Sequence, residues 1–171
     1  MSPMGESPPK LRLLKNGDIW AVYVMERENF IDPWSLENLQ DELARPFSVP
    51  LGLFRDDKLL AYSFSWLIQG ETHLLNLSVG KPFQGMGLGR RLLAAVITIS
   101  VAKGSERVHL EVSEANARAI ALYKSEGFKA VGRRKAYYGD KSDAILMTLT
   151  LGPKKSGAPG ARGARGPAGR G

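Results

Sequence analysis

A glycine-rich turn is the first segment whose residue types suggest binding chemistry. Residues 83–93 read FQGMGLGRRLL: three glycines alternate with other residues, two arginines follow, and apolar residues then recur at helical spacing. The first amides of a helix have no partners within the helix and attract anions, and glycines let a ligand approach the backbone closely. The segment is therefore either a phosphate cradle or an ordinary tight strand-to-helix turn.

Two common phosphate-binding patterns do not fit this turn. A P-loop needs lysine directly after the second glycine, but Gly80 and Gly85 are followed by Met86. A dinucleotide fingerprint needs a further glycine three residues after its first pair, and Arg90 or Leu92 stands at that position. The sequence therefore argues against ATP hydrolysis and against NAD binding.

An acidic residue in a strand-like run is the second candidate for chemistry. Glu111 lies between Leu110 and Val112, near the end of the run RVHLEV. Such an acid either faces an edge of the sheet or lines a cleft, where partial burial raises the pKa of a carboxyl group and suits it to act as a general base. His109 lies two residues earlier on the same side of the strand. It is either an alternative base or an ordinary structural histidine.

Hydrophobic spacing predicts the elements that must position these residues. In the first half we expect a short strand over residues 10–14, a helix over 17–29 and a second helix with its N-cap at Ser35. Pro33 separates the two helices. Short turns then join three strand-like runs into an antiparallel meander. These runs cover residues 49–55, 59–68 and 72–79.

Helices and strands alternate in the second half. We expect a helix from the glycine turn to about residue 102, closed by Gly104. A strand, a helix and a final pair of strands should follow. They cover residues 107–112, 115–125, 128–138 and 143–151. The order β-α-α-β-β-β-α-β-α-β-β predicts an α+β fold, in which helices lie on the faces of a mixed sheet.

The composition excludes several classes of site. The 171 residues include no cysteine, which excludes disulfides, cysteine-based zinc sites and a cysteine nucleophile. With only two histidines we expect no metal site. No apolar run reaches the roughly 18 residues of a membrane span. The N-terminus lacks a signal-peptide pattern, so we expect a cytoplasmic protein without membrane contact.

The chain is expected to hold one domain, residues 10–151, between two disordered segments. Residues 1–9 contain three prolines and few apolar groups. Residues 152–171 are rich in glycine, alanine, arginine and proline, and they carry five of the 24 basic residues of the chain but no acid. The remaining 19 basic and 17 acidic residues nearly balance. The tail is either a flexible segment or one that adds weak, salt-sensitive attraction to RNA or the ribosome.

Several separated motifs resemble the Gcn5-related N-acetyltransferases, the GNAT family. The turn matches Q-x-x-G-x-G through Gln84, Gly87 and Gly89, and residues 110–128, LEVSEANARAIALYKSEGF, look like the second half of that family. The resemblance covers about residues 10–150. It implies a mixed, mostly antiparallel sheet of about seven strands with about four flanking helices, splayed at an acetyl-CoA cleft.

Two further segments narrow the resemblance within the family. Residues 30–34, FIDPW, and residues 133–147, RRKAYYGDKSDAILM, look like the bacterial ribosomal-protein-alanine N-acetyltransferases of the RimI type. The implied acceptor is the N-terminal α-amine of a protein, such as a ribosomal protein that begins with alanine. Other GNAT members acetylate lysines or small amines, so both remain alternatives. A non-catalytic adaptor that binds acyl-CoA is a third interpretation.

The resemblance also implies where acetyl-CoA, the cosubstrate, is held. It would lie in an opening between the strand that ends at Val79 and the strand that ends at Val112. The backbone of the first strand would bind the pantetheine arm, the N–H of Val79 would face the thioester oxygen, and the glycine turn would hold the pyrophosphate. The implied cofactor-binding residues are Leu77, Ser78, Val79, Gln84, Gly85, Met86, Gly87, Leu88, Gly89, Arg90 and Asn116.

The catalytic roles that the resemblance implies fall on two residues. Glu111 would be the general base, acting directly or through water, and Tyr123 would protonate the departing CoA thiolate. Without the resemblance, Tyr123 reads as a core residue of an amphipathic helix. Because the chain has no cysteine, the acetyl group would pass directly to the amine in a ternary complex.

Four aromatic residues are candidates for binding a peptide acceptor. Phe30 and Trp34 would lie on the loop between the first two helices, beside the cleft. Tyr137 and Tyr138 would lie at the last hairpin, where their hydroxyls can bind a peptide backbone. The alternative is that Trp34 and one of the tyrosines are packing residues.

Overall fold

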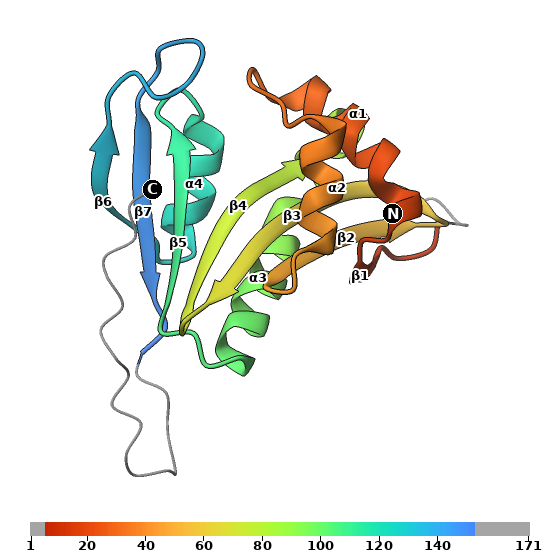
Figure 1. Ribbon diagram of the computed structural model, residues 1–171, viewed down its shortest axis with the longest axis horizontal. Helices are drawn as coiled ribbons and strands as arrows, with labels where there is room; N and C mark the ends of the chain where they lie inside the picture. The colour runs from red at the N-terminus through yellow and green to blue at the C-terminus, as the bar shows by residue number, and fades with distance from the viewer. Residues whose placement is uncertain (1–5, 153–171) are drawn as a thin grey trace.

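A seven-stranded sheet with the order β1-β2-β3-β4-β5-β7-β6 forms the centre of the protein (Figure 1). The computed structural model describes residues 6–152. The strands are β1 (Lys10–Leu13), β2 (Ser48–Arg55), β3 (Lys58–Ile68), β4 (Glu71–Val79), β5 (Arg107–Ser113), β6 (Lys129–Arg134) and β7 (Ala144–Thr150). The helices are α1 (Ile19–Asn29), α2 (Leu36–Ala44), α3 (Leu88–Ala102) and α4 (Ala117–Ser125), with short 3-10 turns at Asn16–Asp18 and Lys81–Phe83. The predicted fold class and element order are confirmed.

The antiparallel meander of β2, β3 and β4 is also confirmed. β2 pairs with β3 and β3 with β4, both antiparallel, and β1 adds to the outer edge of β2. Asp56 and Asp57 join β2 to β3 with positive φ angles of 47° and 64°. Aspartate tolerates this left-handed region better than most residues, which explains the tight turn.

The sheet opens between β4 and β5. These two strands are parallel and pair at four positions only, from Glu71 opposite Arg107 to Leu74 opposite Leu110. Directly after that, the register of β4 against β3 shifts, so Leu75 has no partner on β3. Such a bulge bends a strand. β4 then continues to Val79 beside β3, whereas β5 continues beside β7, and the two arms of the sheet diverge (Figure 1).

Two hydrophobic cores lie on the two faces of the sheet. On one face, α1 and α2 pack on β3 through Val22, Leu39 and Phe64. On the other face, α3 and α4 pack on the sheet in a cluster that includes Leu92 and Tyr123. The sheet thus has helices on both faces, and the cleft between its arms is bordered by helix ends.

Helix caps and a backbone angle explain which predicted element bounds agree with the structure and which do not. The N-cap at Ser35 is confirmed, since its Oγ accepts the Asn38 N–H at 3.1 Å. α4 begins two residues later than predicted because Asn116 is its N-cap. The strand predicted over residues 128–138 is wrong in its second half, because β6 ends at Arg134. Ala136 has a φ of 47° there, which starts a loop that ends at β7.

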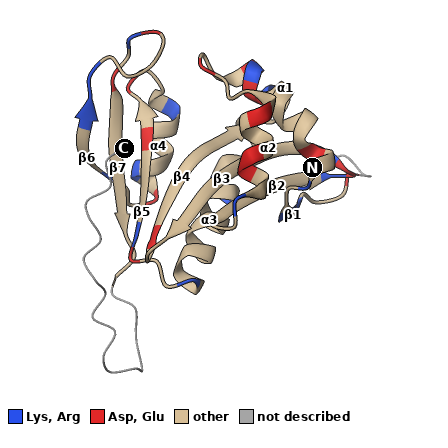
Figure 2. Cartoon of the chain, viewed as in Figure 1, with Lys and Arg blue, Asp and Glu red and all other residues tan. Residues whose placement is uncertain are grey.

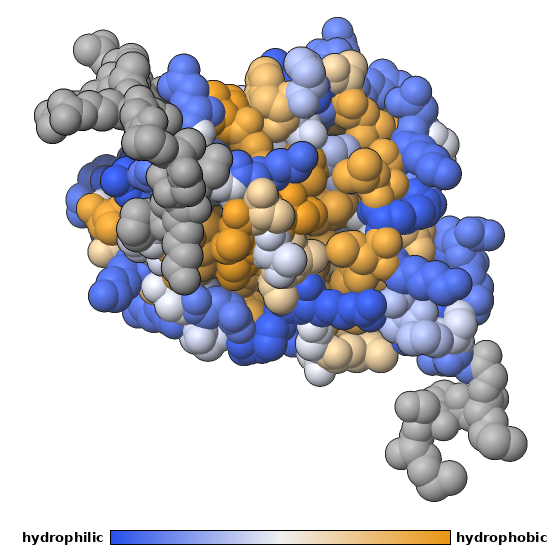
Figure 3. Space-filling view, turned by 90° about the horizontal axis from the view of Figure 1, so that it is seen from below, coloured by the Kyte–Doolittle hydropathy of each residue, from blue (hydrophilic) through white to orange (hydrophobic). Residues whose placement is uncertain are grey.

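The surface of the described residues carries both charge signs. Figure 2 shows acidic and basic residues on both arms of the sheet. Seen from below, apolar residues gather in the middle of the face and hydrophilic residues surround them (Figure 3). Within residues 6–152, no helix is long and apolar enough to cross a membrane. Most of the predicted disordered segments, residues 1–5 and 153–171, lie outside the described residues.

Candidate active site

The end of β4 presents backbone groups to the opening in the sheet. The Gly80 N–H donates to the Leu60 carbonyl at 2.8 Å, so this residue bonds toward β3. Backbone groups of successive strand residues point to opposite sides, so Ser78 also bonds toward β3, while Leu77 and Val79 point away from it. β5 has already diverged on that side. The amides of Leu77 and Val79 therefore face the opening.

The last residue of α1 fixes this end of β4. Asn29 Nδ2 donates to Ser78 Oγ at 2.7 Å and to the Val79 carbonyl at 2.8 Å. Gln84 Nε2 donates to the same carbonyl at 3.2 Å. Asn29 Oδ1 is buried and has no hydrogen-bond partner within residues 6–152. Two side chains thus occupy the carbonyl of Val79, and its N–H remains directed at the opening.

The glycine turn has the geometry of an anion cradle. Gly85 and Gly87 have φ angles of 82° and 79°, a region that side chains disfavour, and α3 begins directly afterwards at Leu88. Both glycines are exposed, and a Cβ added at Gly87 would have nothing within 4 Å. The free amides at the start of this 15-residue helix thus face open space, which suits a pyrophosphate.

A second helix brings a cation to the same turn. Arg118, in the first turn of α4, places its guanidinium 3.4 Å from the position that a Cβ at Gly85 would take. The sequence analysis missed Arg118. Its only signal was its position two residues after Asn116, and the sequence does not reveal that the start of α4 lies beside the glycine turn. Arg118 adds a positive charge where a phosphate is expected.

The other predicted cofactor residues take different positions. Arg90 forms an ion pair with Glu126, so its charge is already partnered. Asn116 uses Oδ1 to cap α4, where it accepts the Ala119 N–H at 3.1 Å. Leu88 is buried in the core, and Met86 is exposed at the tip of the turn. A Cβ at Gly89 would lie 3.6–3.7 Å from side chains of Leu77, Val79 and Leu122.

Glu111 lies on the open arm of the sheet beside an arginine. Its Oε1 is 3.1 Å from Nη2 of Arg134, and the two side chains are 29% and 32% exposed. On β5 it stands opposite Leu146 of β7. This is the partly exposed position that the sequence analysis required of a residue lining a cleft, and Arg134 is a partner that it did not predict.

Burial raises the pKa of two tyrosines, Tyr138 and Tyr123. Burial and the nearby Glu111 carboxylate raise the pKa of Tyr138 to about 12. Burial and the neighbouring Tyr138 raise the pKa of Tyr123 above its usual value. Both tyrosines keep their protons at neutral pH, which suits Tyr123 to donate one.

His109, the alternative base, is engaged in other contacts. Its Nδ1 lies 2.9 Å from Thr148 Oγ1, and its Nε2 lies 3.1 Å from Glu71 Oε2. Its ring also stands 5.3 Å from the ring of His73. Because both ring nitrogens have partners on the sheet, the geometry favours Glu111 as the base.

The predicted acceptor residues lie on two loops that touch. Phe30 and Trp34 belong to the loop between α1 and α2, and Tyr137 and Tyr138 to the loop between β6 and β7. The Gly139 N–H donates to Asp32 Oδ2 at 2.6 Å, which joins the two loops.

The aromatic rings on these loops differ in exposure. Tyr137 is 50% exposed, and its ring is 5.2 Å from that of Tyr138. Trp34 is half-buried and its ring is 5.7 Å from Phe64, which is consistent with a packing role. Tyr137 thus has the larger free surface for a peptide.

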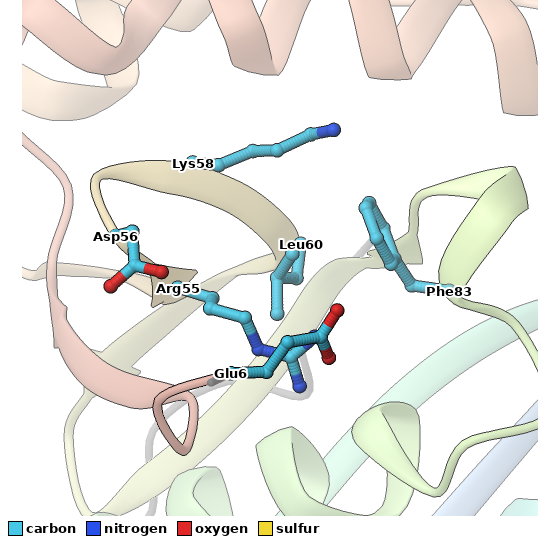
Figure 4. A pocket seen from close by; sticks show the side chains of 6 residues that line it. All are labelled: Glu6, Arg55, Asp56, Lys58, Leu60 and Phe83. Atoms are coloured by element: carbon cyan, nitrogen blue, oxygen red, sulfur yellow. The ribbon is translucent and has the colours of Figure 1, made fainter. Parts of the chain in front are cut away.

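A shallow pocket of about 300 Å³ lies beside the β2–β3 hairpin (Figure 4). In Figure 4, Lys58 and Phe83 flank it and Leu60 lies between them. Although Phe83 precedes the glycine turn, none of the predicted cofactor or catalytic residues lines this pocket. It is therefore separate from the candidate active site. Across residues 6–152 there is also no cluster of three or more acidic or histidine residues that could hold a metal ion.

The profile of the Acetyltransferase (GNAT) family matches residues 19–128, which span the glycine turn, Glu111 and Tyr123. The chain belongs to the GNAT family. It is an N-acetyltransferase, as the sequence analysis predicted. The profile covers both arms of the sheet and ends at Phe128, before the β6–β7 loop. Tyr137 and Tyr138 therefore lie outside the matched segment.

Comparison with individual proteins supports the same assignment. The [ribosomal protein bS18]-alanine N-acetyltransferase of Salmonella typhimurium is 33% identical over 144 residues, covering 82% of this chain and 97% of that protein. The crystal structure of the ribosomal-protein-S18-alanine N-acetyltransferase from Escherichia coli superposes with a TM-score of 0.80 at 31% identity, covering 85% of this chain and 95% of that one. Ard1 from Thermoplasma volcanium, at 22% identity and a TM-score of 0.79, shares the fold.

Proposed function

We propose that this GNAT enzyme transfers the acetyl group of acetyl-CoA to the N-terminal α-amine of a protein that begins with alanine, and that this protein is ribosomal protein bS18. The observation that carries the proposal is the likeness over most of the chain to the two bacterial enzymes named for that acceptor. The site geometry supports it, because Glu111 contacts Arg134, whose guanidinium lies over the ring of Tyr137, and the loop that carries Tyr137 is hydrogen-bonded to the α1–α2 loop.

The chain has the groups that acetyl-CoA requires. The amides at the start of α3, the positive φ angles of Gly85 and Gly87 and the guanidinium of Arg118 would hold the pyrophosphate. The backbone of Leu77 and Val79 would bond the pantetheine arm. Ser78, which the resemblance implied as a further contact, would not bind the arm, since its backbone bonds toward β3 and its hydroxyl accepts a hydrogen bond from Asn29. Gln84 would act indirectly, by holding the Val79 carbonyl.

The chemistry divides among three groups of the protein. Acetyl-CoA supplies an acetyl group that is activated as a thioester. Glu111 accepts a proton from the ammonium of the acceptor, since only the neutral amine is nucleophilic. The N–H of Val79 donates to the acetyl oxygen as negative charge develops on it. Tyr123, which keeps its proton at neutral pH, donates it to the sulfur as the carbon–sulfur bond breaks. The second proton of the attacking nitrogen passes to solvent, and Tyr123 regains a proton from solvent.

An α-amine suits this site better than a lysine side chain. The α-amine has a pKa near 8 and a lysine amine near 10.4, so an α-amine needs less help to lose its proton. Glu111 is paired with Arg134 and is the only acid that we assign to the centre. One carboxylate base suffices for an α-amine, because this amine loses its proton more readily than a lysine amine does.

A panel of acceptors tests the proposal. The full chain is mixed with acetyl-CoA and with peptides that begin with alanine, serine or methionine, including a copy of a bS18 N-terminus. Polyamines and lysine peptides with blocked N-termini serve as controls. CoA release measured with a thiol reagent, and the acetylated nitrogen located by mass spectrometry, should both favour the alanine peptides. Faster transfer to polyamines or lysine would overturn the acceptor, and no CoA release with any amine would overturn the activity.

A further inference from the structure

A buried carboxylate that the chemistry above does not use lies beneath the acceptor loop. Glu26 of α1 is 1% exposed and accepts four hydrogen bonds. Its Oε1 accepts from the Trp34 N–H at 3.1 Å and from Asn76 Nδ2 at 3.2 Å. Its Oε2 accepts from Asn76 Nδ2 at 3.0 Å and from the Tyr62 hydroxyl.

The partners of Glu26 act as donors in every one of these bonds. An ionised carboxylate offers acceptor sites only, so it can satisfy all four, whereas an amide or a protonated acid would place a hydrogen against one of the donors. Burial and the Glu26 carboxylate together raise the pKa of Tyr62 above its usual range, so this donor keeps its proton. Bonds to a buried charge are among the stronger ones in proteins.

The three partners belong to the parts of the molecule that must be aligned for transfer. Trp34 is in the loop between α1 and α2, which carries the proposed acceptor residues. Asn76 follows the unpaired Leu75 on β4, at the point where this strand leaves β5. Tyr62 stands opposite Ser78, which precedes Val79, the residue whose N–H faces the opening between β4 and β5. One side chain thus ties the acceptor loop to the cofactor strand.

We propose that Glu26 is a positioning residue for the acceptor: it fixes the α1–α2 loop against β4, and so sets where the amine lies relative to the Val79 amide. The proposal rests on the proposed function, because it assigns the loop to acceptor binding. Glu26 does not itself touch a substrate, since its carboxylate is enclosed. Its effect on turnover passes through the backbone of Trp34.

The substitution Glu26→Gln keeps the shape of the side chain and removes its charge. The amide places two donors among the Trp34, Asn76 and Tyr62 donors, so the loop should lose its fixed position. We expect the KM for an alanine peptide to rise at least about tenfold, the effect of losing one hydrogen bond to a charged group. The KM for acetyl-CoA should change less than about twofold, because the glycine turn is not altered.

A second buried carboxylate provides a matched control. Glu42 of α2 is 5% exposed and accepts from Trp66 Nε1 at 2.9 Å and from Arg45 Nε at 2.9 Å. Neither of these partners belongs to the acceptor loop. Glu42→Gln should therefore lower the thermal midpoint while leaving both KM values unchanged. If Glu26→Gln also lowers only the midpoint, Glu26 is structural and the proposal is wrong.

Amide hydrogen exchange of the wild-type full chain tests the same contact without a variant. The Trp34 amide should exchange at least about tenfold more slowly than the amide of exposed Ile31 in the same loop. Equal rates would overturn the proposal, and this result decides the question alone if Glu26→Gln fails to fold. Because the measurement needs no acceptor, a failed acceptor panel would refute the proposed function and leave the Glu26–Trp34 contact separately measurable.

Discussion

The Glu111 carboxylate contacts Arg134, and burial together with this carboxylate raises the pKa of Tyr138 to about 12. The contact with Arg134, at 3.1 Å, orients the carboxylate. A carboxylate held in this way can work as a base for an amine whose own pKa is near 8. The contact with Arg134 is therefore consistent with proton removal by Glu111.

Glu111→Gln should lower kcat/KM for an alanine peptide by about 100-fold, the low end of what a positioned general base contributes. His109→Gln is the matched control, since its ring nitrogens are engaged with Thr148 and Glu71. It should leave kcat/KM within about twofold of the wild type. Steady-state kinetics with acetyl-CoA in excess measure both variants. A larger loss in the histidine variant would reverse the assignment of the base.

Tyr123→Phe should lower kcat by about 100-fold with little change in the KM for acetyl-CoA, because it removes a proton donor and keeps the buried ring. Burial raises the pKa of Tyr123, so the hydroxyl is protonated at every pH below its usual range. The pH profile of the wild type between pH 6 and 9 should therefore have the same shape in the variant. Unchanged turnover would remove Tyr123 from the mechanism.

At the scale of elements, the helix and strand order followed from sequence because hydrophobic spacing and caps are local. The N-cap residue Ser35 predicted the start of α2, and the glycine turn predicted the start of α3. The extension of β6 to residue 138 failed because the strand ends through a positive φ at Ala136, an alanine that gives no turn signal.

The candidate site was predictable only where a motif carried it. The glycine turn and Glu111 stood out as candidates from residue types alone, whereas Gln84 and Tyr123, and the role of Glu111 as the base, came from the family resemblance. Arg118, Asn29 and Glu26 were missed, because each has a partner 33 to 50 positions away in the chain, and the nearer partner of Glu26, the backbone amide of Trp34 eight positions away, leaves no mark in the sequence. The sequence alone does not reveal which distant residues become neighbours in the fold. The packing of the helices on the sheet brings these residues together.

Two glycines in the turn allow a paired test of the cradle. Gly87 has a φ of 79°, so Gly87→Ala should destabilise the fold by about 1 kcal/mol and raise the KM for acetyl-CoA. Gly89 lies inside α3, and an added Cβ would meet only ordinary contacts at 3.6 Å or more. Gly89→Ala should be tolerated and should stabilise the helix by up to about 1 kcal/mol.

Thermal unfolding and acetyl-CoA saturation curves measure this pair. Equal KM values for acetyl-CoA in the two variants would contradict the assignment of the turn to the pyrophosphate.

At the scale of the whole molecule, every strand and helix found within residues 6–152 lies between residues 10 and 150. We propose that residues 10–151 are the catalytic domain and that the basic tail is dispensable for it. A chain that ends at Gly152 loses five of its 24 basic residues. It should keep its thermal midpoint and its rate with a free peptide. Lost activity would place the boundary of the domain further along the chain.

The same truncated chain tests the predicted attraction of the tail to RNA. Co-sedimentation with ribosomes at low salt should fall on truncation, since each lost cation weakens contact with phosphates. The difference between the two chains should shrink as salt is added. Equal co-sedimentation at low salt would show that the tail has no such role.

The divergence of β4 from β5 leaves an unpaired strand edge in the middle of a sheet. Exposed edges of this kind recruit strands from other chains and lead to aggregation. On this edge, Asn29 and Gln84 donate to the Val79 carbonyl. A strand from another chain cannot bond to this carbonyl while the two side chains hold it, so the unpaired edge promotes aggregation less.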